Sequence, residues 1–153
     1  MFVSQTKYAK NLVSKFSLEL AKHARTPMST SLYLSKDSSS TDVDPTLYRS
    51  MIGSLLYLTA RRPDIAFSVG VCARYQASPK ESHQPAVKCI IKYVNGALGY
   101  GVWFSTDTPT KLTTFFEADR AGCADDRKST SGRCFYLWNN LVSWHSKKQN
   151  AIS

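Results

Sequence analysis

The period of the hydrophobic pattern changes near Gly99, and this change constrains the fold more than any other feature of the chain. Before it, apolar residues recur every three or four positions, which is typical of amphipathic helices. After it come four short runs rich in aromatic and β-branched residues, separated by polar turns, as expected of strands. These runs are YGVWFS, KLTTFFEAD, GRCFYLW and NLVSWHS. The sequence therefore predicts an α+β protein in which a helical segment precedes a sheet of consecutive antiparallel strands.

The helical part divides into a first helix, a linker and a larger helical unit. Residues 1–24 contain SQTKYAKNLVSKF, in which Tyr8, Leu12 and Phe16 share one helical face. Residues 25–44 are rich in Ser, Thr, Asp and Pro, which indicates a linker or a long loop.

Residues 45–98 predict a unit of three helices. Asp44-Pro45 supplies a capping side chain followed by proline at the first helical position. A second helix is expected from Pro63 and a third from a cap at Ser82, with Asn95-Gly96 as its stop. Their apolar positions are expected to form a core: Leu47, Met51, Ile52, Leu55, Leu56, Leu58, Val87, Ile91 and Val94.

A cluster of carboxylates lies within the strand segment 99–153, in FFEADRAGCADDRKSTSG. If 112–119 is a strand, Glu117 and Asp119 lie on the same face. Two rises of about 3.3 Å per residue put them roughly 7 Å apart. Two carboxylates at a strand end can be half of a two-metal site, which needs further carboxylates from other elements. Asp125 and Asp126 are more typical of a charged hairpin tip. From spacing alone, a solvated loop is the simpler interpretation and a metal site the alternative.

The chain carries a formal charge of +9, which favours polyanionic partners such as RNA, DNA or their hybrid, although many domains are basic without such a partner. Residues 1–100 hold 13 Lys and Arg against 6 Asp and Glu, a balance of +7. Tyr8 and Tyr93 are candidates for base stacking. The candidate phosphate contacts are basic residues predicted at the surface: Lys7, Lys10, Lys15, Arg61, Arg62, Lys88, Lys92, Lys147 and Lys148.

Other classes of function find little support. The four cysteines lie far apart without a CxxC pair, so a zinc site is not expected. No signal peptide opens the sequence, and no apolar run approaches the ~20 residues of a membrane span. The default expectation is an intracellular protein, cytoplasmic or nuclear, with no membrane partner.

Several motifs, in order along the chain, resemble one family. The run from Tyr48 to Ser105, which begins YRSMIGSLLYLTARRPDIAF, resembles the segment after the polymerase core in copia-type retrotransposon Pol polyproteins, particularly those of plants. QTKYAKNLVSKF and ARTPMS are similar to the thumb of their reverse transcriptase. DDRKSTSG, FYL and LVSWHSKKQ resemble the start of their RNase H domain. The resemblance covers essentially the whole chain and implies a thumb, a connection segment and the first strands of an RNase H-like fold.

The resemblance implies a parent protein that couples RNA-directed DNA synthesis to RNase H activity. The polymerase aspartates of that family lie upstream of the segment that this chain resembles. RNase H of this family uses about four carboxylates that bind two Mg²⁺ ions. The first belongs to a motif that usually reads SDADWAG, and Glu117 stands at that Asp position with Asp119 two residues on. The resemblance also places Arg120 at a usual Trp, Trp138 at a usual turn Gly, and Cys89 where a basic residue is common.

The family's next carboxylate belongs to a stretch resembling STAEAEY after SKKQ, beyond Ser153. The resemblance therefore predicts a catalytically inactive remnant that is not an enzyme and needs no cofactor. A domesticated nucleic-acid-binding module and a protein-interaction module are the alternatives. Because the sheet would lack its covering helices, poorly stabilised strands and self-association through the exposed sheet are also expected.

Overall fold

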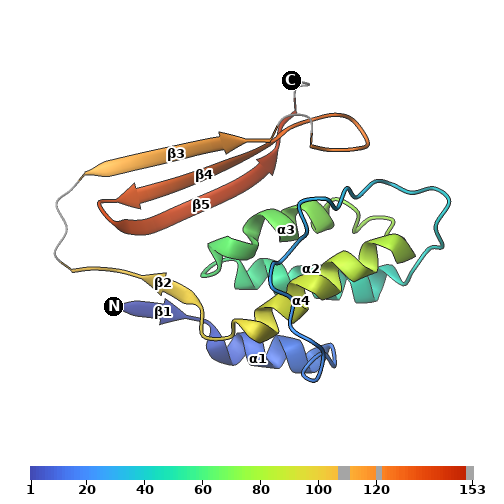
Figure 1. Ribbon diagram of the computed structural model, residues 1–153, viewed down its shortest axis with the longest axis horizontal. Coiled ribbons are helices and arrows are strands. Elements are labelled where there is room, and N and C mark those ends of the chain that lie inside the picture. The colour runs from blue at the N-terminus through green and yellow to red at the C-terminus, as the bar shows by residue number, and fades with distance from the viewer. Residues whose placement is uncertain (107–110, 120–121, 151–153) are drawn as a thin grey trace.

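Four α-helices and two small antiparallel sheets make up the part of the chain that the structure describes, residues 1–106, 111–119 and 122–150 of a computed structural model (Figure 1). The helical elements are α1 (Thr6–Lys15), α2 (Pro45–Leu58), α3 (Pro63–Ala73), the short 3₁₀ helix η1 (Glu81–His83) and α4 (Gln84–Gly96). The strands are β1 (Phe2–Ser4), β2 (Gly101–Trp103), β3 (Leu112–Ala118), β4 (Thr130–Leu137) and β5 (Asn140–Lys148). This mixture of helices and antiparallel sheets confirms the predicted α+β class.

The helices begin and end for local reasons that the sequence carries. The Asp44 carboxylate accepts a hydrogen bond of 2.8 Å from the Thr46 amide, which caps α2 as predicted. Pro63 opens α3 and Gly96 ends α4. The predicted cap at Ser82 is wrong, because Ser82 lies inside η1 and His83 precedes α4.

One apolar core joins all four helices, so α1 packs with the three helices of residues 45–98. Of the predicted core positions, Leu47 and Leu56 are wrong, since each is 46% exposed on the outer side of α2. The remaining predicted positions are buried, and the core also includes Ala9, Leu12, Val13, Ile65, Val69, Cys72 and Ile90.

The predicted linker 25–44 lies against the helices rather than free of them. Leu34 is buried in the core, and its carbonyl oxygen accepts a hydrogen bond of 2.8 Å from the Tyr75 hydroxyl. The buried His83 ring pairs through Nε2 with the carbonyl of Ser35 at 2.7 Å. These contacts position the linker beside α3 and η1.

The strand β2 does not join the C-terminal sheet, which corrects the prediction of consecutive antiparallel strands. It pairs with β1, a three-residue strand too short to show a sequence period, and the two form a sheet of their own. A Cβ at Gly101 would lie 2.3 Å from the carbonyl oxygen of Val3, so only glycine permits this close approach.

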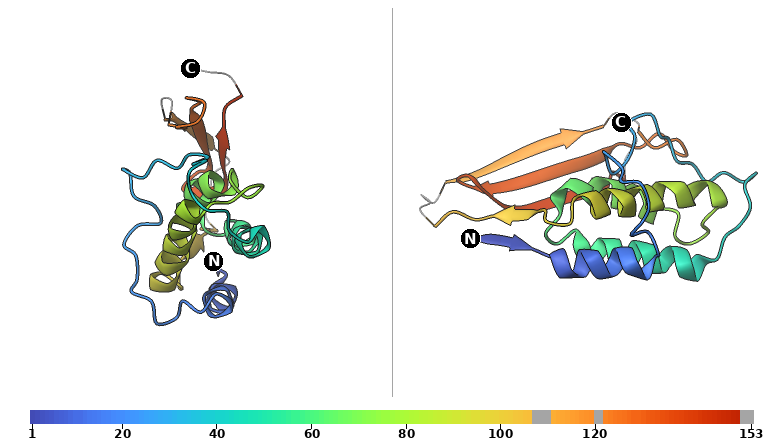
Figure 2. Two further views of the ribbon diagram at one scale, coloured as in Figure 1. Left: turned by 90° about the vertical axis from the view of Figure 1, so that its right-hand side faces the viewer. Right: turned by 60° about the horizontal axis from the view of Figure 1, so that its bottom comes forward.

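The C-terminal sheet has the order β3-β4-β5 and lies to one side of the helices (Figure 1, Figure 2). α3 packs against β5, the Trp144 indole N–H donates to the carbonyl of Thr59 at 2.9 Å, and Arg74 donates to the Thr130 hydroxyl at 2.7 Å. The expectation of a sheet without covering helices is therefore wrong in part, because α3 covers some of one face. Exposed apolar side chains remain on the sheet: Leu112, Phe115, Phe116, Trp138 and Val142.

A two-residue turn connects β4 to β5 and holds Trp138 at a φ of +56°. A hairpin turn with positive φ at its first central residue favours glycine. The residue that the family resemblance marked as unusual therefore occupies a strained backbone position.

Candidate functional site

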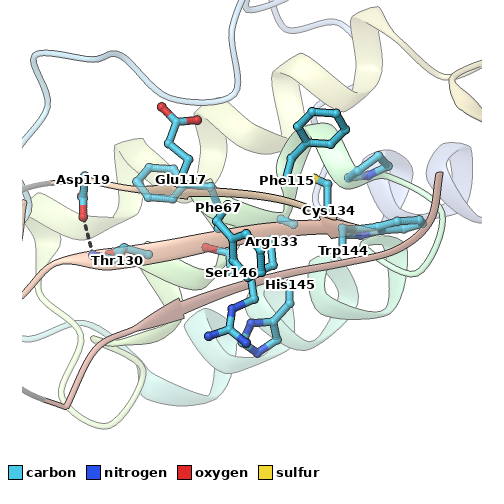
Figure 3. A pocket seen from close by; sticks show the side chains of 14 residues that line it. Phe67, Phe115, Glu117, Asp119, Thr130, Arg133, Cys134, Trp144, His145 and Ser146 are labelled. Atoms are coloured by element: carbon cyan, nitrogen blue, oxygen red, sulfur yellow. Dashed lines mark hydrogen bonds between the residues drawn. The ribbon is translucent and has the colours of Figure 1, made fainter. Parts of the chain in front are cut away.

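The strand β3 places Glu117 as predicted, on the same face as Phe115. In the register of the sheet, Phe115 lies beside Cys134 of β4, which lies beside Trp144 of β5. Glu117 likewise lies in line with Gly132 of β4 and Ser146 of β5. This face looks towards α3, and a groove of about 630 Å³ is lined by Pro63, Ala66 and Phe67 of α3 and by residues of β3, β4 and β5. Figure 3 shows Glu117 and Phe115 on one side of the sheet and Arg133 and His145 on the other. Glu117 itself is exposed.

Asp119, the second predicted metal ligand, is engaged in closing the β3–β4 hairpin. Its amide donates to the carbonyl of Thr130 at 3.1 Å, and its carboxylate accepts a hydrogen bond from the Thr130 amide (Figure 3). A Cβ at Gly122 would lie 2.0 Å from the Asp119 Oδ2 atom, so the other carboxylate oxygen is packed against the loop backbone. Asp119 therefore has a structural role here.

The hairpin-tip carboxylates also make structural contacts. Asp125 accepts hydrogen bonds from the Lys36 amide at 2.8 Å and from the Tyr75 hydroxyl at 3.1 Å, and so holds the linker to α3 and the hairpin. Asp126 forms an ion pair of 2.8 Å with Lys148. The hydrogen bond from Lys148 is the main cause that lowers the pKa of Asp126 to about 2.

The four carboxylates thus do not converge. Within residues 1–106, 111–119 and 122–150, no group of three or more His, Cys, Asp or Glu side chains could hold a metal ion. Arg120, which the resemblance placed at a usual Trp, lies outside the described residues. Of the cluster, Glu117 alone is exposed on the sheet without a described hydrogen bond, so the cluster does not supply the converging carboxylates of a two-metal site.

Most of the basic candidates lie at the surface, on α1, α4 and β5 and in the turn before α3. The exposed residues are Lys7, Lys10 and Lys15 on or at the end of α1, Arg61 before α3, Lys88 on α4, and Lys147 on β5. Lys92 is half-buried one turn along from Lys88. Lys148 is half-buried and paired with Asp126, so its charge is already balanced.

Arg62 is placed in the core instead of at the surface. Its side chain is 1% exposed and donates to the Asp64 carboxylate through Nε and Nη2, at 2.9 and 2.7 Å. A third bond of 3.0 Å reaches the carbonyl of Ala97 at the end of α4. The guanidinium also lies over the rings of Tyr93 and Tyr100, at 5.7 and 5.3 Å from their centroids. Arg62 therefore joins α3 to α4 and has no donor facing solvent.

The predicted stacking residues are engaged with protein groups. The Tyr8 ring lies 4.6 Å from that of Tyr57, and its hydroxyl donates to the carbonyl of Ser54. Tyr93 lies under Arg62 and donates to Asp64 at 3.0 Å; burial, and then this hydrogen bond, raise the pKa of Tyr93.

Two basic groups were missed by the sequence reasoning. The segment after α1 lies along α4, where Asn95 donates to the carbonyls of Leu18 and Glu19 and the Cys89 thiol donates to that of Thr26. This brings the exposed Lys22 and Arg25 of the run KHAR to the helix that carries Lys88 and Lys92. The run itself was the signal that could have found them.

The second missed group lies on the far face of the sheet. Phe116, Arg133 and His145 are paired across β3, β4 and β5, and all three are exposed. The Arg133 guanidinium lies 5.4 Å from the centroid of the Phe116 ring. Lys147 projects from the same face one pair further along. These three residues are far apart in the sequence, and only the pairing register of the strands shows that they form a row.

Comparisons with known proteins identify the relatives of the chain. Retrovirus-related Pol polyproteins from the Arabidopsis thaliana transposons RE2 and RE1 are 35% and 36% identical over 152 residues, which is 99% of this chain. The polyprotein from the Nicotiana tabacum transposon TNT 1-94 is 36% identical over the whole chain. The chain belongs to the retrovirus-related Pol polyprotein family.

This Pol segment spans 10% of the length of the two Arabidopsis polyproteins that it matches. It is also similar to an uncharacterized mitochondrial protein of Arabidopsis thaliana, at 34% identity over the whole chain and 63% of that protein. A secreted RxLR effector protein of Plasmopara viticola is 37% identical over 107 residues, which cover 69% of the Pol segment and 75% of the effector. No family model matches, and no solved structure matches significantly.

No helix in the described part of this Pol segment is long and apolar enough to span a membrane. Burial raises the pKa of the Cys72 thiol to about 12, which keeps this core cysteine protonated and unreactive.

Proposed function

We propose that the chain is a catalytically inactive part of a copia-type Pol polyprotein, and that it comprises a thumb and connection segment followed by the first strands of an RNase H-like domain. The observation that carries this proposal is the fate of the four carboxylates. Glu117 lies alone on β3, whereas Asp119, Asp125 and Asp126 bind the Thr130 amide, the linker and Lys148. A two-metal nuclease needs several free carboxylates that converge on the metals, and among the described residues none converges with Glu117.

The position of Glu117 supports the same conclusion. Glutamate at the family's first Asp position moves the carboxylate by about 1 Å, an error that can lower a rate ~10²-fold even in a complete site. In the parent polyprotein, the activity would be DNA synthesis from an RNA template with RNase H removal of the template.

A cleavage assay tests this proposal. The purified chain is incubated with a labelled RNA–DNA hybrid in Mg²⁺ or Mn²⁺, beside Glu117→Ala and Glu117→Asp variants. We expect all three to show the same background, because Asp at 117 alone supplies no partner carboxylate. Cleavage by the wild-type chain above the Glu117→Ala background would contradict inactivity.

The property that this segment would retain is weak, sequence-independent binding of single-stranded nucleic acid. The row Phe116, Arg133 and His145, with Lys147 beside it, combines an exposed ring with cations on one open face. Aromatic faces stack bases without regard to sequence, and the cations contact phosphates. The basic residues of α1 and α4 add long-range attraction.

Fluorescence anisotropy with a labelled single-stranded RNA tests this property. We expect affinity to fall steeply between 50 and 200 mM salt, because released counterions drive binding. Arg133→Glu should weaken binding more than Arg127→Glu, a control that reverses one exposed charge in the hairpin loop instead of on the row. Equal effects of the two variants would refute a binding site on this face.

A protein-interaction role is the second candidate, favoured by the similarity to a secreted effector over 107 residues. The apolar side chains exposed on the sheet would then contact a protein. Binding of RNA that is lost in Arg133→Glu would favour the nucleic-acid role over this one.

A further inference from the structure

The strand β3 is the open edge of the C-terminal sheet. In the sheet order β3-β4-β5, no described strand pairs with β3 on its outer side. We propose that β3 pairs with β3 of a second copy of this chain, antiparallel and centred on Thr114, to form a continuous six-stranded sheet. This proposal does not depend on the proposed function.

The backbone groups needed for such pairing face outwards. Lys111 and Asp119, which flank β3, each make one backbone hydrogen bond across the hairpin: the Trp138 amide donates to the Lys111 carbonyl at 2.7 Å, and the Asp119 amide donates to the Thr130 carbonyl at 3.1 Å. Along an antiparallel strand the groups of alternate residues face alternate sides. The odd-numbered residues of β3 therefore bond to β4, and Leu112, Thr114 and Phe116 present theirs to the open edge.

Charge complementarity selects the register. A two-fold axis at Thr114 brings Lys111 of each copy opposite Glu117 of the other copy, so the pair occurs twice. Both pairs lie at non-hydrogen-bonded positions, where side chains lie closest. Both side chains are exposed, and the three ion pairs found between described residues use neither. A shift by two residues would instead bring Lys111 to Asp119, whose carboxylate is already held by the Thr130 amide.

The same register pairs apolar side chains on the other face. Leu112 and Phe116, which are 64% and 69% exposed, lie opposite each other across the two-fold axis, and this pair also occurs twice. Thr114 meets its own copy at the centre.

The edge lacks the usual protection against such pairing. Proteins blunt edge strands with proline, with β-bulges or with charges at central positions. β3 has no proline and no charge between Lys111 and Glu117, and the register shift of the sheet lies between β4 and β5. The open edge is thus suited to another strand of the same kind.

Sedimentation equilibrium of the 153-residue chain and of charge variants tests the pairing. We expect a reversible dimer that Lys111→Glu or Glu117→Lys weakens by about 2- to 30-fold each, since two cross-strand pairs are lost in each case. The double variant Lys111→Glu/Glu117→Lys recreates both pairs and should restore the wild-type affinity. Lys7→Glu and Glu81→Lys change the net charge equally, away from β3, and should leave the affinity unchanged.

Residue-resolved hydrogen exchange by NMR tests the register independently. The amides of Leu112, Thr114 and Phe116 should gain protection as protein concentration rises, whereas those of Thr113, Phe115 and Glu117 should not change. Thr114→Lys, which places like charges at the centre of the pairing, should abolish the gain while the protection of β4 and β5 shows that the sheet remains folded.

Three results would overturn the proposal. The first is a chain that stays monomeric up to about 1 mM. The second is a charge-swapped double variant that dimerises no better than its single parents. The third is protection that rises with concentration at odd-numbered residues of β3.

Discussion

The buried pair of Arg62 and Asp64 is expected to be the most sensitive polar contact of the helical core. Arg62 is 1% exposed and Asp64 is 29% exposed. Replacing Asp64 by Asn removes the counter-charge and leaves the guanidinium in a site that water cannot reach. Removing one partner of a buried ion pair typically costs 3–5 kcal/mol. Because Asp64 is partly hydrated and Arg62 keeps its bond to Ala97, we expect about 3 kcal/mol, at the low end of this range.

Thermal unfolding followed by circular dichroism measures this cost. For a domain of this size each kcal/mol lowers Tm by about 2–4 °C, so Asp64→Asn should lower Tm by roughly 6–12 °C. The control is Arg61→Met, which changes the exposed neighbour of Arg62 and should shift stability by less than about 0.5 kcal/mol.

A double-mutant cycle isolates the pair. Arg62→Met combined with Asp64→Asn should cost less than the sum of the single changes by at least about 1 kcal/mol, because the two side chains are in contact. If Asp64→Asn behaved like the Arg61→Met control, or if the two changes were additive, Arg62 would be a hydrated surface residue and the interpretation of the core would be refuted.

Four further outcomes are expected. The pKa of Asp126 lies at about 2, below its ordinary 3.8, so its ion pair with Lys148 stabilises the fold above about pH 4, and that contribution is lost as the pH falls towards 2. NMR titration of the Asp126 carboxyl group should give the lowered pKa, and Lys148→Met should raise it. Trp138→Gly relieves the positive φ and should raise the unfolding free energy by up to about 1 kcal/mol in urea denaturation, whereas a loss of that size would contradict strain at the turn. Gly101→Ala forces the Val3 carbonyl away and should cost about 1–3 kcal/mol, with faster exchange of the β1 and β2 amides; unchanged exchange would show that the strands can separate freely. Trp144→Phe removes the bond to Thr59 at the end of α2 and should cost about 1 kcal/mol while the helices stay folded, and a cost near zero would mean that this contact does not hold the sheet to the helices.

The sequence predicted the elements whose signals are local. Asp44-Pro45, Pro63 and Gly96 fix the ends of helices within a few residues, and alternation alone placed Glu117 and Phe115 on one face of β3. Each of these depends on neighbours in the chain, which a single sequence contains.

What the sequence could not predict depends on distant partners. The strand β1 exists because Val3 pairs with Val102, almost one hundred residues away. Arg62 looked like a surface cation because nothing near it in the sequence reveals its contacts with the rings of Tyr93 and Tyr100 and with the Ala97 carbonyl. The roles of the hairpin carboxylates likewise depend on the linker and on β5.

The most direct test of the central claim is a Mn²⁺ titration followed by NMR, because the paramagnetic ion broadens the signals of nearby nuclei. The claim is that no two-metal site survives around Glu117, since Asp119, Asp125 and Asp126 are held by other groups. We predict no saturable broadening localised at β3 and the hairpin with a dissociation constant tighter than about 1 mM. Saturable broadening of Glu117 and Asp119 together, abolished by Glu117→Ala, would show that the carboxylates converge on a metal and would contradict the account.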